Sequence, residues 1–365
     1  MDAHHPSDLG VAAYARNVTG RVTVARLLAA VQSIAAVAGD DRALRAEVLG
    51  VIRRFVSFDA HAFLLTDPST TVGCSPVAHI PDLSTLPDLV RLKYLTRVNR
   101  WTALPPSGGA SLQGATGGRP EQSLLWREYL AGLGMLDVFS AVFKDRYGCW
   151  GFLDLWRTKR FSSVEEAALV GIIPAITSRL RAVQTAAFTG VETPHHGPGA
   201  LVLSPELRVR AQTPQTQDWF AALIPPHGGH DPIPASAYNV AAQLLAIEAG
   251  VDLHPARARV HLGSGRWLTL RADRLAGSEP SVNREVMVTM QPSSPAERRD
   301  LFSRCHGLSP REDEVLRHLA DGVDTRTVAR LMSISEFTVQ DHLKSVFTKT
   351  RTSSRRQLLS RSGGG

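Results

Sequence analysis

Residues 308–359 constrain the fold of this chain more than any other stretch. Ser309 is followed by Pro310 and then by Glu312. This is the order of a helix cap, a first helical residue and the closing member of a capping box. Apolar residues recur behind these signals at spacings of three and four. The stretch therefore predicts three or four short helices that share one small core.

Short turns separate the expected helices. The first helix stops at Gly322, which suits a left-handed residue, and the second covers residues 325–332. Ser335 caps a third helix that runs to about Thr350, and a last short helix lies near residues 354–359. Two short helices with so tight a connection form a helix-turn-helix. The second helix of that motif can enter the major groove of DNA.

The exposed face of the third helix carries side chains that suit base recognition. Gln340 can bond adenine twice, Lys344 can donate to guanine, and Asp341 can accept from cytosine or repel a phosphate. A solvated polar face is the other interpretation. Further residues can contact the DNA backbone, which positions a protein without reading sequence. These expected backbone contacts are Arg326, Ser335, Thr338, Lys349, Arg355 and Arg356.

The order LSPRExEVLxxLAxG, followed by VARLMSISEFTVQDHLKSVFTKT, closely resembles the LuxR/NarL-type helix-turn-helix domain. The resemblance covers about a seventh of the chain and implies the same three base-reading positions. One position departs from the family, because Arg351 stands where a Gly usually ends the third helix. A non-Gly residue in the left-handed conformation costs on the order of 1 kcal/mol. We therefore expect the helix to end differently here, by running on or fraying.

Charge is concentrated in the same part of the chain. The net charge of the 365 residues is +7, and residues 301–365 carry four of these seven charges. A basic C-terminal module suits a polyanion such as DNA, although a membrane surface would also favour it.

The preceding sequence predicts a multidomain protein with two α+β domains before the all-α tetrahelical helix-turn-helix domain of residues 300–362. Residues 1–22 show little periodicity and are expected to be a disordered lead-in. Helix and strand patterns over residues 23–188 resemble a GAF domain. Residues 189–199, which include His195 and His196, are typical of a linker, and the strand and helix order of residues 200–292 resembles a PAS domain.

Three local patterns in the first domain also give predictions. Strand-like alternation at residues 60–65, 138–144 and 150–157 includes a hairpin. The basic pattern of residues 89–101 favours a solvated helix face. A long helix over residues 163–188 starts with Ser163 as cap and bends at Pro174. Its apolar stripe is expected to be core in the N-terminal half, with a dimer contact as a second interpretation of the C-terminal half.

Several classes of protein are poorly matched. Cys74, Cys149 and Cys305 are too far apart and too few for a disulfide framework or a cysteine metal site, which favours a reducing cytoplasm. No apolar run approaches the ~18 residues that would cross a membrane. We find no GxSxG, HExxH, paired-cysteine or P-loop signature, and therefore expect neither an enzyme nor a cofactor. No marker of a known ligand is present.

The sequence therefore predicts a cytoplasmic transcriptional regulator gated by an N-terminal sensory region. One recognition helix reads few base pairs, so a homodimer on paired half-sites of double-stranded DNA is expected. RNA polymerase and a small-molecule ligand are further partners that we consider. The competing interpretation is a signal-sensing or protein-interaction module whose helical tail makes dimer or partner contacts without specific DNA binding.

Overall fold

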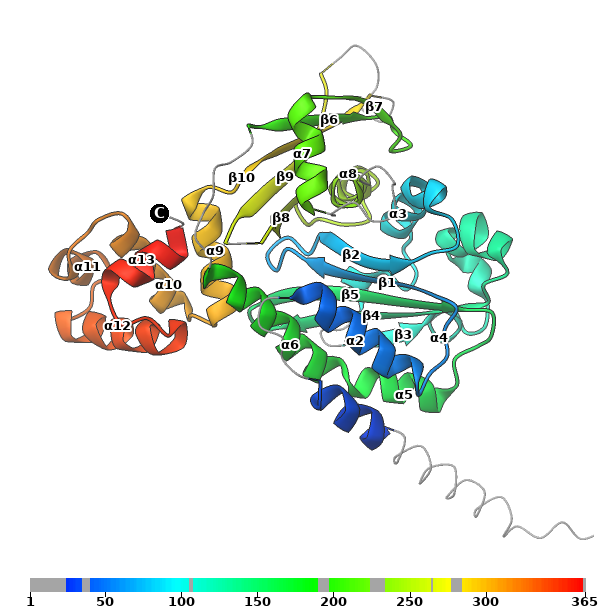
Figure 1. The fold of residues 1–365 in the computed structure, drawn as a ribbon, viewed down its shortest axis with the longest axis horizontal. Coiled ribbons are helices and arrows are strands. Elements are labelled where there is room, and N and C mark those ends of the chain that lie inside the picture. Colours follow the sequence, from blue (N-terminus) through cyan, green and yellow to red (C-terminus); the bar gives the residue numbers. More distant parts are fainter. Residues whose placement is uncertain are drawn as a thin grey trace, which may run out of the picture.

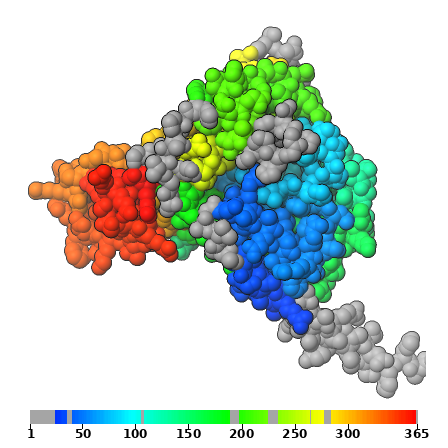
Figure 2. Space-filling model, in the orientation of Figure 1, coloured from blue at the N-terminus to red at the C-terminus, as the bar shows by residue number. Residues whose placement is uncertain are grey.

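The computed structural model describes residues 24–34, 40–104, 108–189, 197–223, 234–263, 265–276 and 284–363. Two units with one sheet each form the body of the molecule, and a helical C-terminal domain (residues 310–363) projects from it (Figures 1 and 2). The predicted lead-in, and most of the predicted linker with His195 and His196, lie outside the described residues. No described helix has the length and apolar character needed to cross a membrane.

The first unit contains a five-stranded antiparallel sheet. Its strands are β1 (Ala60–Thr66), β2 (Gly73–His79), β3 (Gly109–Ser111), β4 (Asp137–Asp145) and β5 (Gly148–Arg157), in the order β2-β1-β5-β4-β3. The predicted first strand and the β4–β5 hairpin are confirmed. Sequence patterns missed β2 and β3. The helices of this unit include α2 (Asp41–Arg53), α3 (Leu86–Leu95), α4 (Leu112–Ala115), α5 (Ser163–Gly171) and α6 (Ile173–Ala186), and residues 24–32 are also helical.

The second unit repeats this strand order. It contains β6 (Gly199–Leu203), β7 (Val209–Gln212), α7 (Pro214–Leu223), α8 (Ala235–Glu248), β8 (Arg257–His261), β9 (Trp267–Arg274) and β10 (Val286–Pro292). The order across its antiparallel sheet is β7-β6-β10-β9-β8. The predicted succession of two strands, helices and three strands is confirmed.

Helix α8 joins the two units into one body. It packs against β9 of its own sheet and against β2 and α3 of the first unit, and Figure 1 shows it between the two sheets. Almost all of its side chains are buried. One hydrophobic cluster, with Phe63 and Leu268 among its members, extends through both units. The two sheets therefore share a core.

The segment predicted to be a solvated basic helix is partly buried. Helix α3 ends at Leu95, and both Lys93 and Arg100 lie inside the protein. Lys93 Nζ lies 2.9 Å from Asp154 Oδ2, and Arg100 Nη2 lies 2.7 Å from Asp252 Oδ2. The solvated-face prediction is wrong for these two residues, because carboxylates distant in the sequence make their burial tolerable.

Pro174 divides the predicted long helix into α5 and α6. Ser162, not Ser163, caps α5, and it forms a capping box with Glu165. The C-terminal half of the apolar stripe packs within the chain against α9 (Pro295–His306), which leaves Leu180 and Val183 buried. These two residues are intramolecular core, and the second interpretation, a dimer contact, is wrong for them.

A buried ion cluster ties both units to α9. The Arg259 guanidinium on β8 bonds Asp67 of the β1–β2 turn through Nε and Nη2, at 2.7 and 2.8 Å. Its Nη1 lies 2.8 Å from Asp300 Oδ2 and 2.9 Å from the Glu297 carbonyl oxygen, both on α9. Arg259 and Asp67 are both buried. One side chain thus holds three segments that are remote in the sequence.

We expect Asp67→Asn to destabilise the body strongly. The change leaves the buried Arg259 without its main counter-charge, a loss of about 3–5 kcal/mol. Asp88→Asn is the matched control, because Asp88 also bridges the two units through an arginine, Arg208, but the pair is solvent-exposed and is worth about 0–1 kcal/mol. Urea unfolding of the full chain measures both. Equal losses in the two variants would show that Arg259 does not hold the units together.

Candidate nucleic-acid interface

The C-terminal domain consists of four helices, as predicted. They are α10 (Pro310–Ala320), α11 (Thr325–Leu331), α12 (Glu336–Thr350) and α13 (Arg355–Gly363). Ser309 and Glu312 form the predicted capping box of α10, and Ser335 caps α12 by accepting from the Thr338 backbone N–H at 3.0 Å. Asp324 caps α11. Local signals in the sequence therefore position the starts of α10, α11 and α12.

A small core fixes the angle between α11 and α12. Val328 and Ala329 of α11 pack against Val339 and Leu343 of α12, together with Val315 of α10. The turn between the helices passes through Ser333, which has a φ of 55°. This arrangement buries one face of α12 and leaves the opposite face in solvent, which is the geometry of a recognition helix.

The three predicted base readers lie together on the solvent face of α12. Gln340, Asp341 and Lys344 are exposed, and their spacings of one, three and four put them on one stripe of the helix. Within the described part of the chain, none of the three side chains has a hydrogen-bond or ion-pair partner. The fold does not use these polar groups, and they are free to bind another molecule.

Three of the predicted backbone contacts are at the N-terminal side of α12. Ser335 and Thr338 are joined through their hydroxyls at 2.8 Å. Arg326 on α11 is highly exposed, and its Nε lies 3.8 Å from Glu336 Oε1. Arg356, in the first turn of α13, is also exposed. These positions suit contacts with phosphate groups, and their role stays a prediction.

Lys349 and Arg355 have partners within the domain. Lys349 Nζ lies 2.6 and 2.8 Å from the two carboxylate oxygens of Glu312. Arg355 Nη2 donates to the Leu319 and Val323 carbonyl oxygens, at 3.2 and 2.9 Å. Both side chains therefore hold α10 against its neighbours. A DNA contact by either residue stays a prediction. Such a contact would have to form in addition to these internal hydrogen bonds, or in place of them.

Glu312 connects α10 to α12 from a buried position. It is 5% exposed, and it accepts from Ser345 Oγ and from the Ser309 backbone N–H, each at 2.6 Å. Burial alone would raise the pKa of the Glu312 carboxyl. The hydrogen bonds from Lys349, Ser345 and Ser309 outweigh burial and lower this pKa from 4.5 to about 2. We call the contacts of Glu312 with Ser345 and Lys349 the clamp on Glu312. The sequence indicated the capping box but not this clamp, since Lys349 lies 37 residues away.

Arg351 takes the left-handed conformation expected of the Gly that it replaces. Its φ and ψ are 50° and 44°, and its N–H returns to the Phe347 and Thr348 carbonyl oxygens. Helix α12 ends at Thr350. The prediction that it runs on or frays here is wrong, because the cap forms with the non-Gly residue in place.

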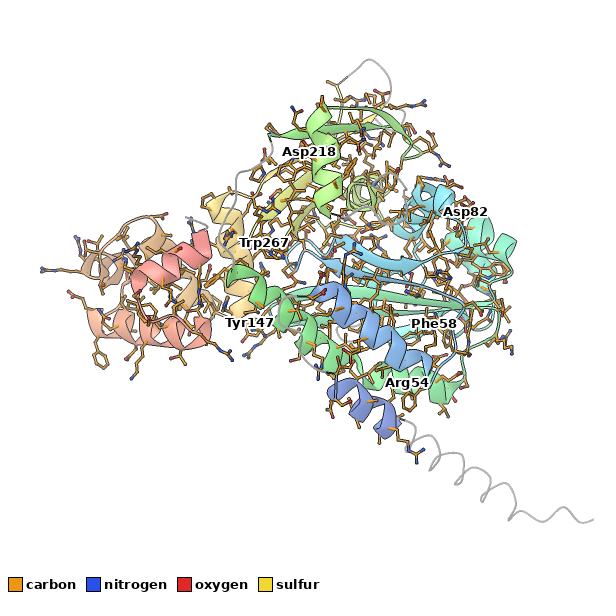
Figure 3. All side chains as sticks on the ribbon, viewed as in Figure 1. Arg54, Phe58, Asp82, Tyr147, Asp218 and Trp267 are labelled. Atoms are coloured by element: carbon orange, nitrogen blue, oxygen red, sulfur yellow. The ribbon has the colours of Figure 1, made fainter. Side chains whose placement is uncertain are left out.

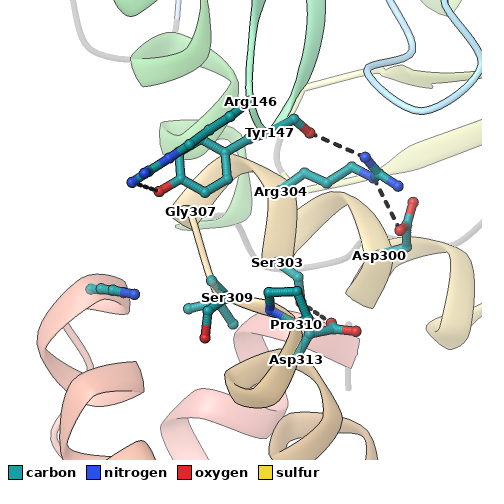
Figure 4. Close-up of a pocket in the computed structure, with 11 residues that line it drawn as sticks. Arg146, Tyr147, Asp300, Ser303, Arg304, Gly307, Ser309, Pro310 and Asp313 are labelled. Atoms are coloured by element: carbon teal, nitrogen blue, oxygen red, sulfur yellow. Dashed lines mark hydrogen bonds and ion pairs between the residues drawn. The ribbon is translucent and has the colours of Figure 1, made fainter.

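The domain joins the body through α9 and a single left-handed glycine. Gly307 ends α9 with a φ of 65°, and Ser309 already caps α10. Arg304 on α9 donates to the Tyr147 carbonyl oxygen at 3.1 Å, and Arg181 of α6 donates to the Cys305 carbonyl oxygen at 3.0 Å. A cleft of about 520 Å³ separates the β4–β5 turn from the C-terminal domain at this joint (Figure 4).

Comparison with known proteins agrees with this geometry. Residues 306–361 match the model of the family described as bacterial regulatory proteins, luxR family. The C-terminal domain is therefore a LuxR-type helix-turn-helix domain, as its sequence resemblance predicted. Over 79 residues the chain is 33% identical to the transcriptional regulatory protein DesR of Bacillus subtilis (strain 168). That match spans 22% of this chain and 40% of DesR. The family model does not extend to the two sheet-containing units.

Among the described residues, no group of His, Cys, Asp and Glu side chains is arranged to hold a metal ion. Trp101, Cys149 and Trp150 are buried in the core of the first unit, and Trp101 stacks on Phe152 with ring centroids 4.7 Å apart. These residues pack together as part of the core.

Glu312→Gln should destabilise the C-terminal domain by about 2 kcal/mol at neutral pH, because it removes the charge that holds Lys349. The folded-state pKa of Glu312 is depressed, so its contribution is complete above about 4.5 and is lost as pH falls toward about 2. The difference between wild type and variant should therefore shrink over that range in denaturant unfolding. Glu314→Gln, on the same helix but paired with the exposed Arg311, is the control and should show little difference at any pH.

Arg351→Gly should stabilise the domain by about 0.5–1 kcal/mol, since glycine adopts the left-handed conformation without strain. Thermal unfolding of the full chain measures the change in the transition that involves this domain. Arg356→Gly, which removes the same charge from a helical position, should instead lower stability by about 1 kcal/mol. A loss of stability in Arg351→Gly would contradict the strain at this position.

Proposed function

We propose that this protein is a sequence-specific DNA-binding transcriptional regulator that binds promoter DNA as a homodimer in the cytoplasm. The observation that carries the proposal is the solvent stripe of α12, where Gln340, Asp341 and Lys344 are exposed on a LuxR-type domain. The similarity to DesR, which is named as a transcriptional regulatory protein, supports the same function. The two sheet-containing units would act as GAF-like and PAS-like sensory domains.

Base reading is assigned to the stripe and DNA backbone binding to the residues around it. Gln340 offers the paired donor and acceptor that match adenine, Lys344 suits guanine, and Asp341 suits the amino group of cytosine. Arg326, Ser335, Thr338 and Arg356 would contact phosphates, with Lys349 and Arg355 contributing where their internal bonds permit. One such helix reads few base pairs, so two copies on paired half-sites are needed for useful specificity.

Gating by the sensory region is supported by the attachment of α9. Phe302 on α9 packs edge-on against Phe188 of the first unit, with ring centroids 5.3 Å apart, and Phe188 stacks on Trp267 of the second unit at 5.1 Å. Tyr147 and Trp267 lie next to α9 (Figure 3). A rearrangement in either unit would therefore move α9. A small molecule that binds the sensory region, and RNA polymerase, are the further partners that we propose.

The competing function is a signal-sensing or interaction module whose helical tail contacts a protein partner. Salt dependence separates the two functions, since a protein that neutralises phosphates releases counterions and loses affinity steeply as salt rises. Gel-shift titrations of the full chain at two salt concentrations test this. An absence of DNA binding at low salt would favour the interaction module.

Variants of the stripe and of its surroundings should differ in sequence dependence. Selection from random DNA with the full chain first defines the preferred sequence. Gln340→Ala or Lys344→Ala should then lose about 1–3 kcal/mol of discrimination at one base position. Arg326→Ala should weaken binding to all sequences alike and lower the salt slope by about 1. If all three substitutions weakened binding equally on every DNA sequence, the assignment of base readers would be wrong.

A further inference from the structure

Phe337 is a large apolar side chain in an unusual place. It is 76% exposed, in the first turn of α12. Helix α12 contributes Val339 and Leu343 to the core of the C-terminal domain, and Phe337 is not part of that core. Phenylalanine is also a poorer helix former than alanine. Neither packing nor helix formation therefore explains this residue, although one exposed apolar side chain alone would need no explanation.

Its position aligns it with the proposed base readers. Phe337 precedes Gln340 by three residues, Asp341 by four and Lys344 by seven, so all four side chains share one face of α12. It also follows the cap residue Ser335 closely. In a helix-turn-helix, the N-terminal part of the second helix contacts base edges in the major groove. A helix docked by its polar stripe therefore brings the Phe337 ring against the bases.

The chemistry of the groove identifies what this ring can contact. The phenyl ring has no hydrogen-bond donor or acceptor, so it gains nothing from the polar edges of the bases. The C5 methyl group of thymine is the apolar feature of the major groove, and phenylalanine is among the side chains that contact it. Contact with the methyl would remove exposed apolar surface from water on both partners.

We infer that Phe337 is a further specificity-determining residue, which selects thymine at one position of each half-site through its C5 methyl group. This inference rests on the proposed function and adds an apolar reader to the three polar ones. The ring would also exclude cytosine at that position, since cytosine presents an amino group without a methyl beside it. The selected thymine lies toward the N-terminal end of α12.

Replacement of single thymines by uracil tests the inference, because it removes the methyl group and changes no hydrogen bond. The full chain is used, with sequences selected from random DNA and each thymine replaced in turn. At one thymine per half-site, uracil should lower wild-type affinity about three- to fivefold, the effect of burying one methyl group. Phe337→Ala should bind the thymine sequence about tenfold more weakly and show no further loss with uracil there.

Leu331→Ala provides the matched control. Leu331 is an exposed apolar residue of the same motif, at 57%, but it lies on α11. This variant should keep the full response to uracil. Unchanged unfolding midpoints for both variants confirm that the domain is intact, as expected for exposed positions.

Three outcomes would overturn the inference. Wild-type affinity could be unaffected by uracil at every thymine, or Phe337→Ala could respond to uracil as strongly as wild type. Either result would show that Phe337 does not contact the methyl group, and neither would contradict the proposed function. If selection instead yields no preferred sequence, the proposed function fails, and the inference fails with it.

Discussion

A buried guanidinium cannot be left without partners, and Arg259 on β8 meets this requirement with groups from two other segments. Asp67 supplies both carboxylate oxygens from the β1–β2 turn, while Asp300 and the Glu297 carbonyl supply the rest from α9. Each partner is needed, because an uncompensated buried charge costs several kcal/mol. The cluster therefore fixes α9 against both sheets at once. Since only Gly307 and Leu308 separate α9 from Ser309, the cap of α10, the position of the whole C-terminal domain depends on this contact.

The shared core around α8 is a second reason why the position of the C-terminal domain depends on the packing of both units. A helix buried between two sheets transmits displacement to both of them, because close-packed side chains leave no space in which to absorb it. The aromatic contacts of Phe188 with Trp267 and Phe302 then connect each unit to α9. The proposed gating does not need a flexible linker between the two sheet-containing units and the C-terminal domain. It needs two packings of α9 on the body that differ in their preference for bound DNA.

The sequence predicted the parts of this structure whose causes are local. Ser309 with Glu312, and Ser335 at the start of α12, are cap signals that act within four residues. The β4–β5 hairpin is also local. By contrast, Lys93 and Arg100 resembled a solvated helix face because their partners, Asp154 and Asp252, lie 61 and 152 residues further along the chain. Strand β2, with its Gly, Cys, Ser and His residues, lacks the alternation that identifies a strand, and pairing with β1 determines its structure. In the candidate site, the free stripe was predictable from helical spacing, whereas the clamp on Glu312 was not.

Helix α12 divides its polar groups between folding and, in the proposed function, recognition of DNA. Ser345 and Lys349, four residues apart, face Glu312 and hold α10. The stripe on the other side carries one cation, Lys344, and one anion, Asp341, so it contributes almost no net attraction for a polyanion. In the proposed function, attraction would then come from the arginines outside the stripe, at positions 326, 351, 355 and 356. Under this proposal, affinity for DNA and specificity for its sequence would depend on different residues. An electrically neutral stripe would gain little free energy from an arbitrary sequence. It would favour DNA only where each of its hydrogen-bonding groups, and the proposed apolar contact of Phe337, meets a complementary base.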